Sequence, residues 1–395
     1  MKVKVAVICH FNNDSITDLL GIKRRREFAP WIFEFLQLFN SSDKYELHVI
    51  APHYGVWGYK RIAFSHSTIL HFFPDYRIRG LRFFNDLIRE HTNFLLHRRQ
   101  ISRICKKINP SIIHLFGAEN PYYGLSALDL IAKYPVVVTI QGIVNHVKET
   151  GRTVEFRKRA EIKVIGKVKH FGVRDQDMIQ FILNHNVAPI FHYHEIPIKQ
   201  VRMEISAAGN YDLIFFARLV KSKGIEDYIS LVNTLKISRG AIKAAIVGTG
   251  ESGYIEVLKQ RVKELDISEN VYWIGELESI DQVHKHVAGS KMVVLPTYAD
   301  TIPGTILESF QLRIPVISYA VGGIPSLNQN RESLELIDKG DVNSLAECVL
   351  RLLDNIERRK FLADNGAETF NERWGSAQLF SQFDNMYSSI LNVSS

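Results

Sequence analysis

The chain has 395 residues, of which 46% are hydrophobic and 23% are charged, and its formal net charge is +7. These are the proportions of a globular protein, and they exclude collagen-like and disordered chains. A single core stops growing at about 250–300 residues, so we expect two domains. The sequence offers neither the roughly 20 apolar residues of a membrane span nor an apolar N-terminal run long enough for a signal peptide, so we expect a cytoplasmic protein.

Three cysteines, Cys9, Cys105 and Cys348, lie far apart and form no Cys-x-x-Cys pair. Their spacing predicts neither a zinc site nor a disulfide framework, and it fits a reducing compartment.

The first 200 residues alternate strand-like and helical patterns. Apolar runs predict strands at KVKVAVICH (2–10), YELHVIAP (45–52), SIIHLFG (111–117), PVVVTIQG (135–142) and VKHFGV (168–173). EFAPWIFEFLQLF (27–39) has helical spacing between the first two of them. Short apolar strands separated by helices are typical of a parallel sheet with crossover helices.

The charge of the chain is uneven along its length. Residues 1–200 contain 29 Lys and Arg against 17 Asp and Glu, whereas the remainder contains 20 against 25. Within the first half, residues 72–107 interleave arginines with aromatic and aliphatic residues at helical spacing. This stretch is either a surface helix with an apolar inner face or a peripheral contact with an anionic membrane. No groove-reading or base-stacking motif supports nucleic acid as the partner.

The second half repeats the same organisation. Strands are predicted at YDLIFFARL (211–219), AIKAAIVGTG (241–250), NVYWIGEL (270–277), KMVVLPTY (291–298) and IPVISYAVGG (314–323). We therefore predict an α/β protein with two Rossmann-like, doubly wound domains at 1–200 and 205–375. The boundary falls within residues 192–210, and we expect the C-terminal helix, about 376–395, to pack back on the first domain.

Ligands of doubly wound sheets bind beyond the carboxyl ends of the strands, so polar residues at those ends are the candidate site. Arg218 and Lys223 follow one predicted strand and could neutralise a diphosphate. Glycines follow the next two strands, at Gly248, Gly250 and Gly275, where they permit turns or a close approach of ligand to backbone.

The stretch ADTIPGTILESF (299–310) places two carboxylates around a small-residue loop. Gly304 precedes a predicted helix, and a helix N-terminus is an anion site. Glu308, one turn into that helix, could accept hydrogen bonds from a ribose diol, and Asp300 could face the other end of a ligand. Taken singly, a structural role is favoured for each acid: a cap or turn residue for Asp300, and compensation of the helix dipole for Glu308.

The order ARLVKSKG, VGTGE, VYWIGEL and PTYADTIPGTILESFQLRIPVISYAVGGIP resembles the donor domain of retaining GT-B glycosyltransferases, in particular family 4, the glycosyl transferases group 1. The resemblance covers at least residues 211–330. The family's acidic pair falls on Asp300 and Glu308, although its first member is usually Glu. The resemblance implies the GT-B fold, with two Rossmann-like domains facing across a cleft.

The resemblance also implies roles for the candidate residues. Asp300, Arg218 and Lys223 would be catalytic, with the two cations stabilising the departing diphosphate and Asp300 contacting the donor sugar. Glu308 would hold the ribose. The other expected donor-binding residues are Gly304, Thr305, Ile306, Gly248, Gly250 and Gly275. The reaction would need no metal and no bound cofactor, because the cations and the helix terminus supply the positive charge.

The first half resembles the acceptor domain more loosely. His114 in INPSIIHLFGAENP, Gln141 in PVVVTIQG and Arg174 in KHFGVRDQDM are the expected acceptor-side residues. The family often has His where Gln141 stands, and Gln cannot carry a proton between pH 5 and 8. A core histidine remains the alternative for His114, and a strand-end glutamine for Gln141.

We therefore expect a hexosyltransferase that uses a UDP- or GDP-linked sugar and a glycan or lipid-linked acceptor in cell-surface polysaccharide or glycolipid biosynthesis. It would work in the cytoplasm, at the inner face of the membrane. Two alternatives are a non-catalytic nucleotide-sugar-binding protein and a sugar-nucleotide epimerase. Donor binding without turnover would indicate the first, and conversion of donor without acceptor the second.

Overall fold

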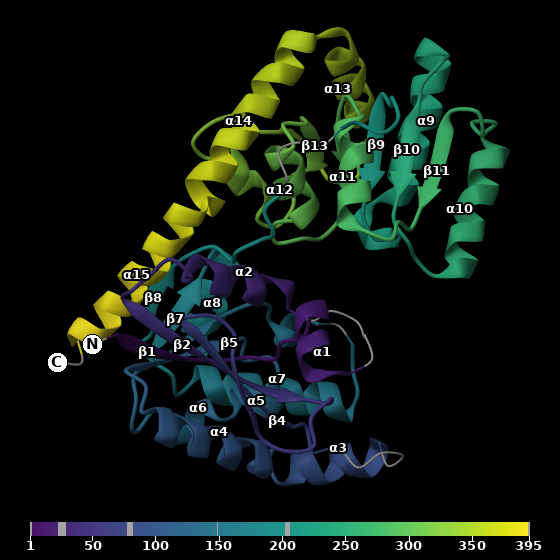
Figure 1. The fold of residues 1–395 in the computed structure, drawn as a ribbon. Helices are drawn as coiled ribbons and strands as arrows, with labels where there is room; N and C mark the ends of the chain where they lie inside the picture. Colours follow the sequence, from purple (N-terminus) through teal and green to yellow (C-terminus); the bar gives the residue numbers. More distant parts are fainter. Residues whose placement is uncertain (1, 23–28, 77–81, 148, 202–205, 394–395) are drawn as a thin grey trace. The chain divides into compact units, whose positions relative to one another are not determined.

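The computed structural model divides the chain into two compact units (Figure 1). Unit 1 comprises residues 1–199 and 376–395, and unit 2 comprises residues 200–375. The structure describes all residues except 1, 23–28, 77–81, 148, 202–205 and 394–395. Part of the basic stretch at 72–107 and part of the expected boundary at 192–210 therefore lie outside the described residues.

Unit 1 is built on an eight-stranded sheet with the order β3-β4-β2-β1-β5-β6-β7-β8. Its strands are β1 (Val3–Ile8), β2 (Tyr45–His53), β3 (Lys60–Ala63), β4 (Thr68–Pro74), β5 (Ile112–Phe116), β6 (Val136–Thr139), β7 (His170–Val173) and β8 (Ile190–Tyr193). All neighbours pair in parallel except β3 and β4, which form an antiparallel edge. The strands predicted from the sequence are all present, whereas β3, β4 and β8 were not predicted.

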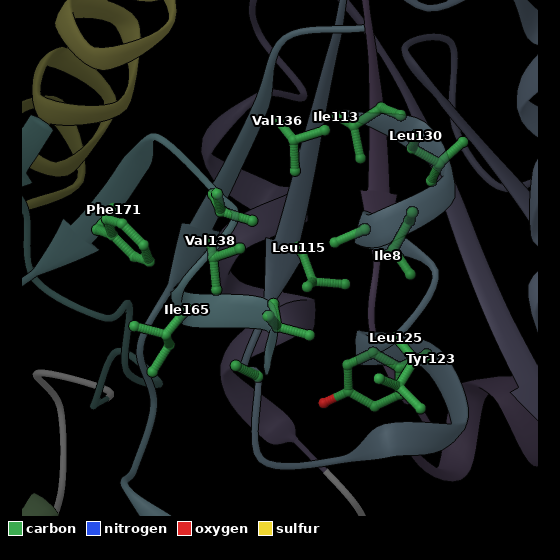
Figure 2. Packing of buried hydrophobic residues seen from close by; sticks show 14 of the residues in the cluster. Ile8, Ile113, Leu115, Tyr123, Leu125, Leu130, Val136, Val138, Ile165 and Phe171 are labelled. Carbon is green, nitrogen blue, oxygen red and sulfur yellow. The ribbon is translucent and has the colours of Figure 1, made fainter. Parts of the chain in front are cut away.

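Helices cover both faces of this sheet. They are α1 (Asp14–Leu20), α2 (Pro30–Leu38), α3 (Arg82–His91), α4 (Leu95–Ile108), α5 (Pro121–Gly124), α6 (Ala127–Leu130), η1 (Val144–His146), α7 (Arg152–Ile165), α8 (Gln176–Leu183) and α15 (Ser376–Val393). Successive residues of β1 point to opposite faces. Ala6 and Ile8 belong to one apolar cluster, shown in Figure 2, and Val5 and Val7 to the other. A strand buried on both faces reads as a continuous apolar run, which is why the sequence predicted β1 so clearly.

The C-terminal helix α15 belongs to unit 1. Its residues Phe383, Met386, Tyr387 and Ile390 are buried in the second apolar cluster. Asp384 on the same helix accepts a hydrogen bond from the Tyr45 hydroxyl at 2.7 Å. The chain therefore returns to its first unit after completing the second.

Unit 2 is built on a six-stranded sheet with the order β11-β10-β9-β12-β13-β14, all parallel. Its strands are β9 (Leu213–Phe216), β10 (Ala244–Val247), β11 (Val271–Gly275), β12 (Val293–Leu295), β13 (Val316–Tyr319) and β14 (Glu335–Ile337). Its helices are η2 (Lys221–Lys223), α9 (Ile225–Arg239), α10 (Ser252–Glu264), α11 (Ile280–Ala288), α12 (Gly304–Gln311), η3 (Ile324–Asn328), α13 (Val342–Asp354) and α14 (Ile356–Trp374).

Each sheet has one point at which the strand order reverses. In unit 2 the chain runs outward from β9 through β10 to β11, then returns to β12 beside β9 and runs outward the other way. In unit 1 the reversal lies between β1 and β5. A crevice opens at such a switch point, beyond the carboxyl ends of the strands, and ligands bind there. The predicted fold class, α/β with two doubly wound parallel sheets, is confirmed.

None of the described helices is long and apolar enough to cross a membrane. Within the same described ranges, no three His, Cys, Asp or Glu side chains gather as a metal site would require. The three cysteines are buried and unpaired with one another.

Candidate functional site

The loops that follow β9 and β12 meet at the switch point of unit 2. Gly224 has a φ of +77°, and a Cβ there would lie 1.8 Å from the Pro296 carbonyl oxygen, so only glycine fits. The Tyr298 amide and the Thr297 hydroxyl both donate to the Ser222 carbonyl, at 2.8 and 3.0 Å. These contacts hold the two candidate loops against each other.

Lys223 and Asp300 form an ion pair across this junction. Both side chains are largely buried, with exposed fractions of 16% and 18%. Thr297 donates a further hydrogen bond to Asp300 Oδ2 at 3.1 Å. The sequence assigned Lys223 and Asp300 to different parts of a ligand, and the structure pairs them with each other.

Arg218 lies just beyond the end of β9 and is exposed. Its guanidinium makes no ion pair with any residue that the structure describes. It can therefore reach a ligand at this edge without first breaking a protein contact.

The first turn of α12 presents backbone amides at the same edge. The amides of Ile306 and Leu307 donate to the Pro303 carbonyl at 3.1 and 3.4 Å. The amides of Gly304 and Thr305 have no partner within the helix, as the first amides of a helix do not. The Ile306 side chain is fully buried. Three residues of this turn were expected to bind a ligand. The amides of Gly304 and Thr305 are available for this, whereas the Ile306 side chain packs in the core.

Glu308 also lies on α12, and its carboxylate Oε2 is 3.0 Å from His284 Nε2. His284 is on the neighbouring helix α11 and is only 3% exposed. The other carboxylate oxygen, Oε1, lies 3.6 Å from the position that a Cβ would take at Gly304. The carboxylate therefore stands over the start of its own helix. Sequence patterns did not single out His284.

The glycines after β10 and β11 shape the neighbouring loop. Gly248 has a φ of +136°, and a Cβ there would lie 2.0 Å from the Ala217 carbonyl oxygen. Gly250 is equally constrained, with the Leu219 carbonyl oxygen 2.4 Å from its missing Cβ. Both glycines thus bring the β10 loop against the β9 loop. Gly275, in contrast, faces open space.

A further acid at this edge was missed by the sequence reading. Asp227, in the first turn of α9, accepts hydrogen bonds from the hydroxyls of Tyr298 and Tyr319, both at 2.6 Å. The hydrogen bond to Asp227 is the main reason that the pKa of Tyr298 rises to about 12. The sequence feature that could have pointed to Asp227 is its position three residues after Gly224, where an acid lies at the positive end of the α9 dipole.

The acceptor-side residues lie in unit 1, and the structure separates them. His114 is fully buried on β5, with Nδ1 2.6 Å from the Tyr387 hydroxyl and Nε2 2.7 Å from Thr139 Oγ1. Burial lowers the pKa of His114 well below its ordinary value. The core alternative for His114 is therefore the one that the structure matches, because its imidazole has no exposed surface with which to contact an acceptor.

Gln141 and Arg174 do lie at the carboxyl edge of the unit 1 sheet. Arg174 follows β7 and donates to the carbonyls of Ile140 and Gln141 at 3.2 and 2.8 Å. Arg174 thus orders the loop after β6, and the Gln141 side chain is partly exposed there.

Glu119, in the loop after β5, is a third residue that sequence patterns did not single out. Its Oε2 atom is buried and has no hydrogen-bond partner among the described residues. Burial raises the pKa of Glu119 to about 7.

Most of unit 2 matches a known protein family. Residues 200–369 match the model of the family described as glycosyl transferases group 1. The chain is 25% identical over 179 residues to N-acetyl-alpha-D-glucosaminyl L-malate synthase of Bacillus anthracis, a match that covers 45% of each chain. It is 23% identical over 342 residues to the putative teichuronic acid biosynthesis glycosyltransferase TuaC of Bacillus subtilis (strain 168), covering 81% of this chain and 84% of TuaC. The match to the first relative thus spans less than half of that protein's length.

Solved structures resemble the chain over nearly its whole length. Sucrose-phosphate synthase from Thermosynechococcus elongatus superposes with a TM-score of 0.72 at 14% identity, covering 99% of this chain and 100% of that one. HepE from Anabaena in complex with UDP superposes with a TM-score of 0.65 at 15% identity, covering 98% and 100%. At these identities the likeness shows the fold. The chain therefore has the GT-B fold, and residues 200–369, within unit 2, match the glycosyl transferases group 1 family.

Proposed function

We propose that the protein transfers a hexose from a nucleotide sugar to an acceptor hydroxyl, with retention of configuration, as a family 4 glycosyltransferase. One observation carries the proposal. Two cations from the segment after β9, and two backbone amides and a carboxylate from α12 after β12, converge at the switch point between these strands. This set matches the two parts of a nucleoside diphosphate, because the cations and amides suit the diphosphate and the carboxylate suits the ribose.

Each residue then has a role in the transfer. When the bond between the anomeric carbon and the diphosphate breaks, its electron pair stays on the diphosphate. Arg218, Lys223 and the amides of Gly304 and Thr305 stabilise that growing charge. Because these groups supply the positive charge, the proposed reaction needs no metal. Asp300 contacts the donor sugar, and the donor diphosphate takes its place on Lys223.

The names of similar proteins support a particular donor and acceptor class. HepE was crystallised with UDP and with UDP-glucose, and a corynebacterial relative is named as a GDP-mannose-dependent mannosyltransferase. Other relatives are named for teichuronic acid, capsular polysaccharide and amylovoran biosynthesis. We therefore propose a UDP- or GDP-linked donor and a growing cell-surface glycan, or its lipid-linked precursor, as the acceptor.

A transfer assay tests this proposal. The protein is incubated with UDP-glucose, UDP-N-acetylglucosamine or GDP-mannose and a panel of octyl glycosides, and the product linkage is read by NMR. The expected result is release of nucleoside diphosphate with one donor, and an α-linked product from the α-linked donor. A β-linked product would contradict retention. Well-folded protein that releases no nucleoside diphosphate with any pair would contradict the transfer itself.

We propose further that unit 1 meets an anionic membrane at the cytoplasmic face through α3 and α4. Leu87, Ile88 and Leu96 are 39%, 56% and 57% exposed, whereas large apolar side chains usually lie inside. A cavity of about 730 Å³ lies between α4 and α6. Its lining includes the cations Arg98, Arg99, Arg103, Lys106 and Lys133. Apolar side chains beside cations on one helical face suit a surface of acidic lipid.

Flotation with vesicles tests this contact. The protein should float with vesicles that contain phosphatidylglycerol and remain behind with phosphatidylcholine alone, at low salt. The charge reversal Arg99→Glu with Arg103→Glu should abolish flotation. The matched reversal Arg261→Glu with Lys263→Glu, on the exposed face of α10, should leave it unchanged. Flotation that survives the first reversal would contradict this surface.

A further inference from the structure

His284 lies behind Glu308 in unit 2, with one ring nitrogen bonded and the other unused. Its Nε2 atom is 3.0 Å from Glu308 Oε2. Its Nδ1 atom is buried and has no hydrogen-bond partner among the residues described by the structure. The ring as a whole is 3% exposed.

The chemistry of the pair decides which nitrogen carries the hydrogen. An ionised carboxylate only accepts hydrogen bonds, so Nε2 must be the donor, and in the neutral ring Nδ1 then holds a lone pair. A buried acceptor without a partner is unfavourable for stability. An apolar side chain at this position would avoid that penalty. The presence of histidine is therefore better explained by its bond to Glu308 than by packing, because local rules are most often broken at functional sites.

The bond to His284 determines where the rest of the Glu308 carboxylate points. With Oε2 held from α11, Oε1 stands over Gly304, next to the two amides at the start of α12. The Glu308 side chain is 25% exposed, so this oxygen is open to a ligand from one side. A carboxylate held in this way can accept from a hydroxyl without first losing its rotational freedom.

We infer that His284 is a positioning residue, which fixes Glu308 to receive the 2′- and 3′-hydroxyls of a nucleotide ribose. The inference rests on the proposed function, since it assumes that a nucleoside diphosphate binds at this edge of unit 2. It adds a residue on another helix to that site and predicts that the site distinguishes ribose from deoxyribose.

The test compares binding of UDP, GDP and ADP, and of their 2′-deoxy counterparts, by calorimetry with the full chain. His284→Phe removes the donor and keeps a buried ring, whereas His284→Gln keeps a donor close to the position of Nε2. His286→Phe is the matched control, because His286 lies on the same helix and bonds to the Tyr211 hydroxyl at 3.2 Å instead.

The expected result has three parts. His284→Phe binds the preferred ribonucleotide roughly tenfold or more weakly, as loss of a charged hydrogen bond predicts. It also loses the preference for ribose over deoxyribose, which a purely structural role would leave intact. His284→Gln recovers most of the affinity and most of the preference for ribose, and His286→Phe binds nucleotides as the wild type does. In the absence of ligand, His284→Phe melts no lower than the wild type.

Other outcomes overturn the inference. Unchanged affinity and unchanged ribose preference in His284→Phe would show that Glu308 needs no support. If His284→Phe does not fold, His284→Asn takes its place, since its amide ends too early to reach Glu308. Wild-type affinity in His284→Asn would then overturn the inference. If the wild type binds no nucleotide, both the proposed function and this inference are overturned. If the wild type binds a nucleotide and His284→Phe binds it equally well, only the inference is overturned.

Discussion

At the scale of single residues, the ion pair between Lys223 and Asp300 is the contact that most affects the proposed site. In the unliganded protein the Asp300 carboxylate holds the cation that a diphosphate would need. Under the proposed function, a free nucleoside diphosphate would have to compete with Asp300 for Lys223, and a nucleotide sugar would recover part of that cost through the proposed contact of Asp300 with the sugar.

Asp300→Asn should tighten the binding of free UDP or GDP by a few-fold, because the competing charge is gone. The same variant should slow sugar transfer by about 10- to 100-fold, since the contact to the donor sugar is weakened in the transition state. Calorimetry and the transfer assay measure the two effects. Asp300→Glu, which restores the residue usual in the family, should keep transfer. Weaker nucleotide binding by Asp300→Asn would contradict this account of the pair.

Glu119 predicts a pH dependence of stability. Burial raises its pKa from 4.5 to about 7 in the folded chain, while Arg157 and Arg174 oppose the shift and Glu161 adds to it. A carboxyl with a raised folded pKa binds its proton more tightly when folded, so its contribution is fully present below about pH 4.5. That contribution is lost as the pH rises to about 7, and it amounts to at most about 3 kcal/mol.

Glu119→Gln should therefore flatten the fall in unfolding free energy between pH 5 and pH 8. Urea unfolding of wild type and variant at pH 5, 6, 7 and 8 measures this, with Glu269→Gln on the exposed surface as the control. Parallel pH profiles for wild type and Glu119→Gln would show that Glu119 does not titrate in this range.

The positions of the proposed donor-side residues at the carboxyl edge of the sheet could be predicted from the sequence. Arg218, Lys223, Asp300 and Glu308 could be named because they follow apolar strands at the carboxyl edge. Which of them pair could not be predicted, because the Lys223–Asp300 contact joins residues 77 positions apart. The sequence left His114 open between an acceptor-side residue and a core histidine, because its burial depends on Tyr387, which comes from the last helix of the chain.

At the scale of secondary-structure elements, the glycine that begins α9 holds the loops after β9 and β12 together. Gly224→Ala would place a methyl group 1.8 Å from the Pro296 carbonyl oxygen and force a φ of +77° on alanine. We expect a loss of about 2–4 kcal/mol in unfolding free energy, together with loss of nucleotide binding.

Gly253→Ala is the matched control, because Gly253 is in the first turn of α10 and nothing lies within 4 Å of its missing Cβ. Alanine there should be neutral or stabilise by up to about 1 kcal/mol. Denaturant unfolding measures both variants. Equal stability of the two would contradict the close approach of the loops.

Most strands of both sheets could be predicted because they read as largely buried apolar runs, whereas β8 and β14 are only partly buried and were not predicted. The β3–β4 edge could not, because β3 (KRIA) carries two cations, is largely exposed and shows no apolar run. The ends of α12 also escaped prediction, since its N-cap Pro303 makes no side-chain hydrogen bond.

At the scale of the whole molecule, the chain builds two doubly wound sheets, each with one reversal of strand order, and then returns to the first unit. The reversal of strand order between β9 and β12 could not be read from the sequence, because strand order depends on which crossovers pack on which face. This reversal nevertheless brings the loop that carries Arg218 and the loop that leads to Gly304 to one edge of the sheet. The central claim is that this edge binds a nucleoside diphosphate.

Thermal unfolding of the full chain with UDP, GDP and ADP tests that claim most directly. One nucleotide, at about 100 times its Kd, should raise the melting temperature by several degrees. Both Glu308→Ala and Arg218→Ala should abolish the rise, measured against each variant without ligand. Arg218→Ala should leave the melting temperature of the unliganded protein within about a degree of the wild type, whereas Glu308→Ala should lower it, because it removes the partner of the buried His284. No rise with any nucleotide, or a rise that both variants retain, would contradict the account.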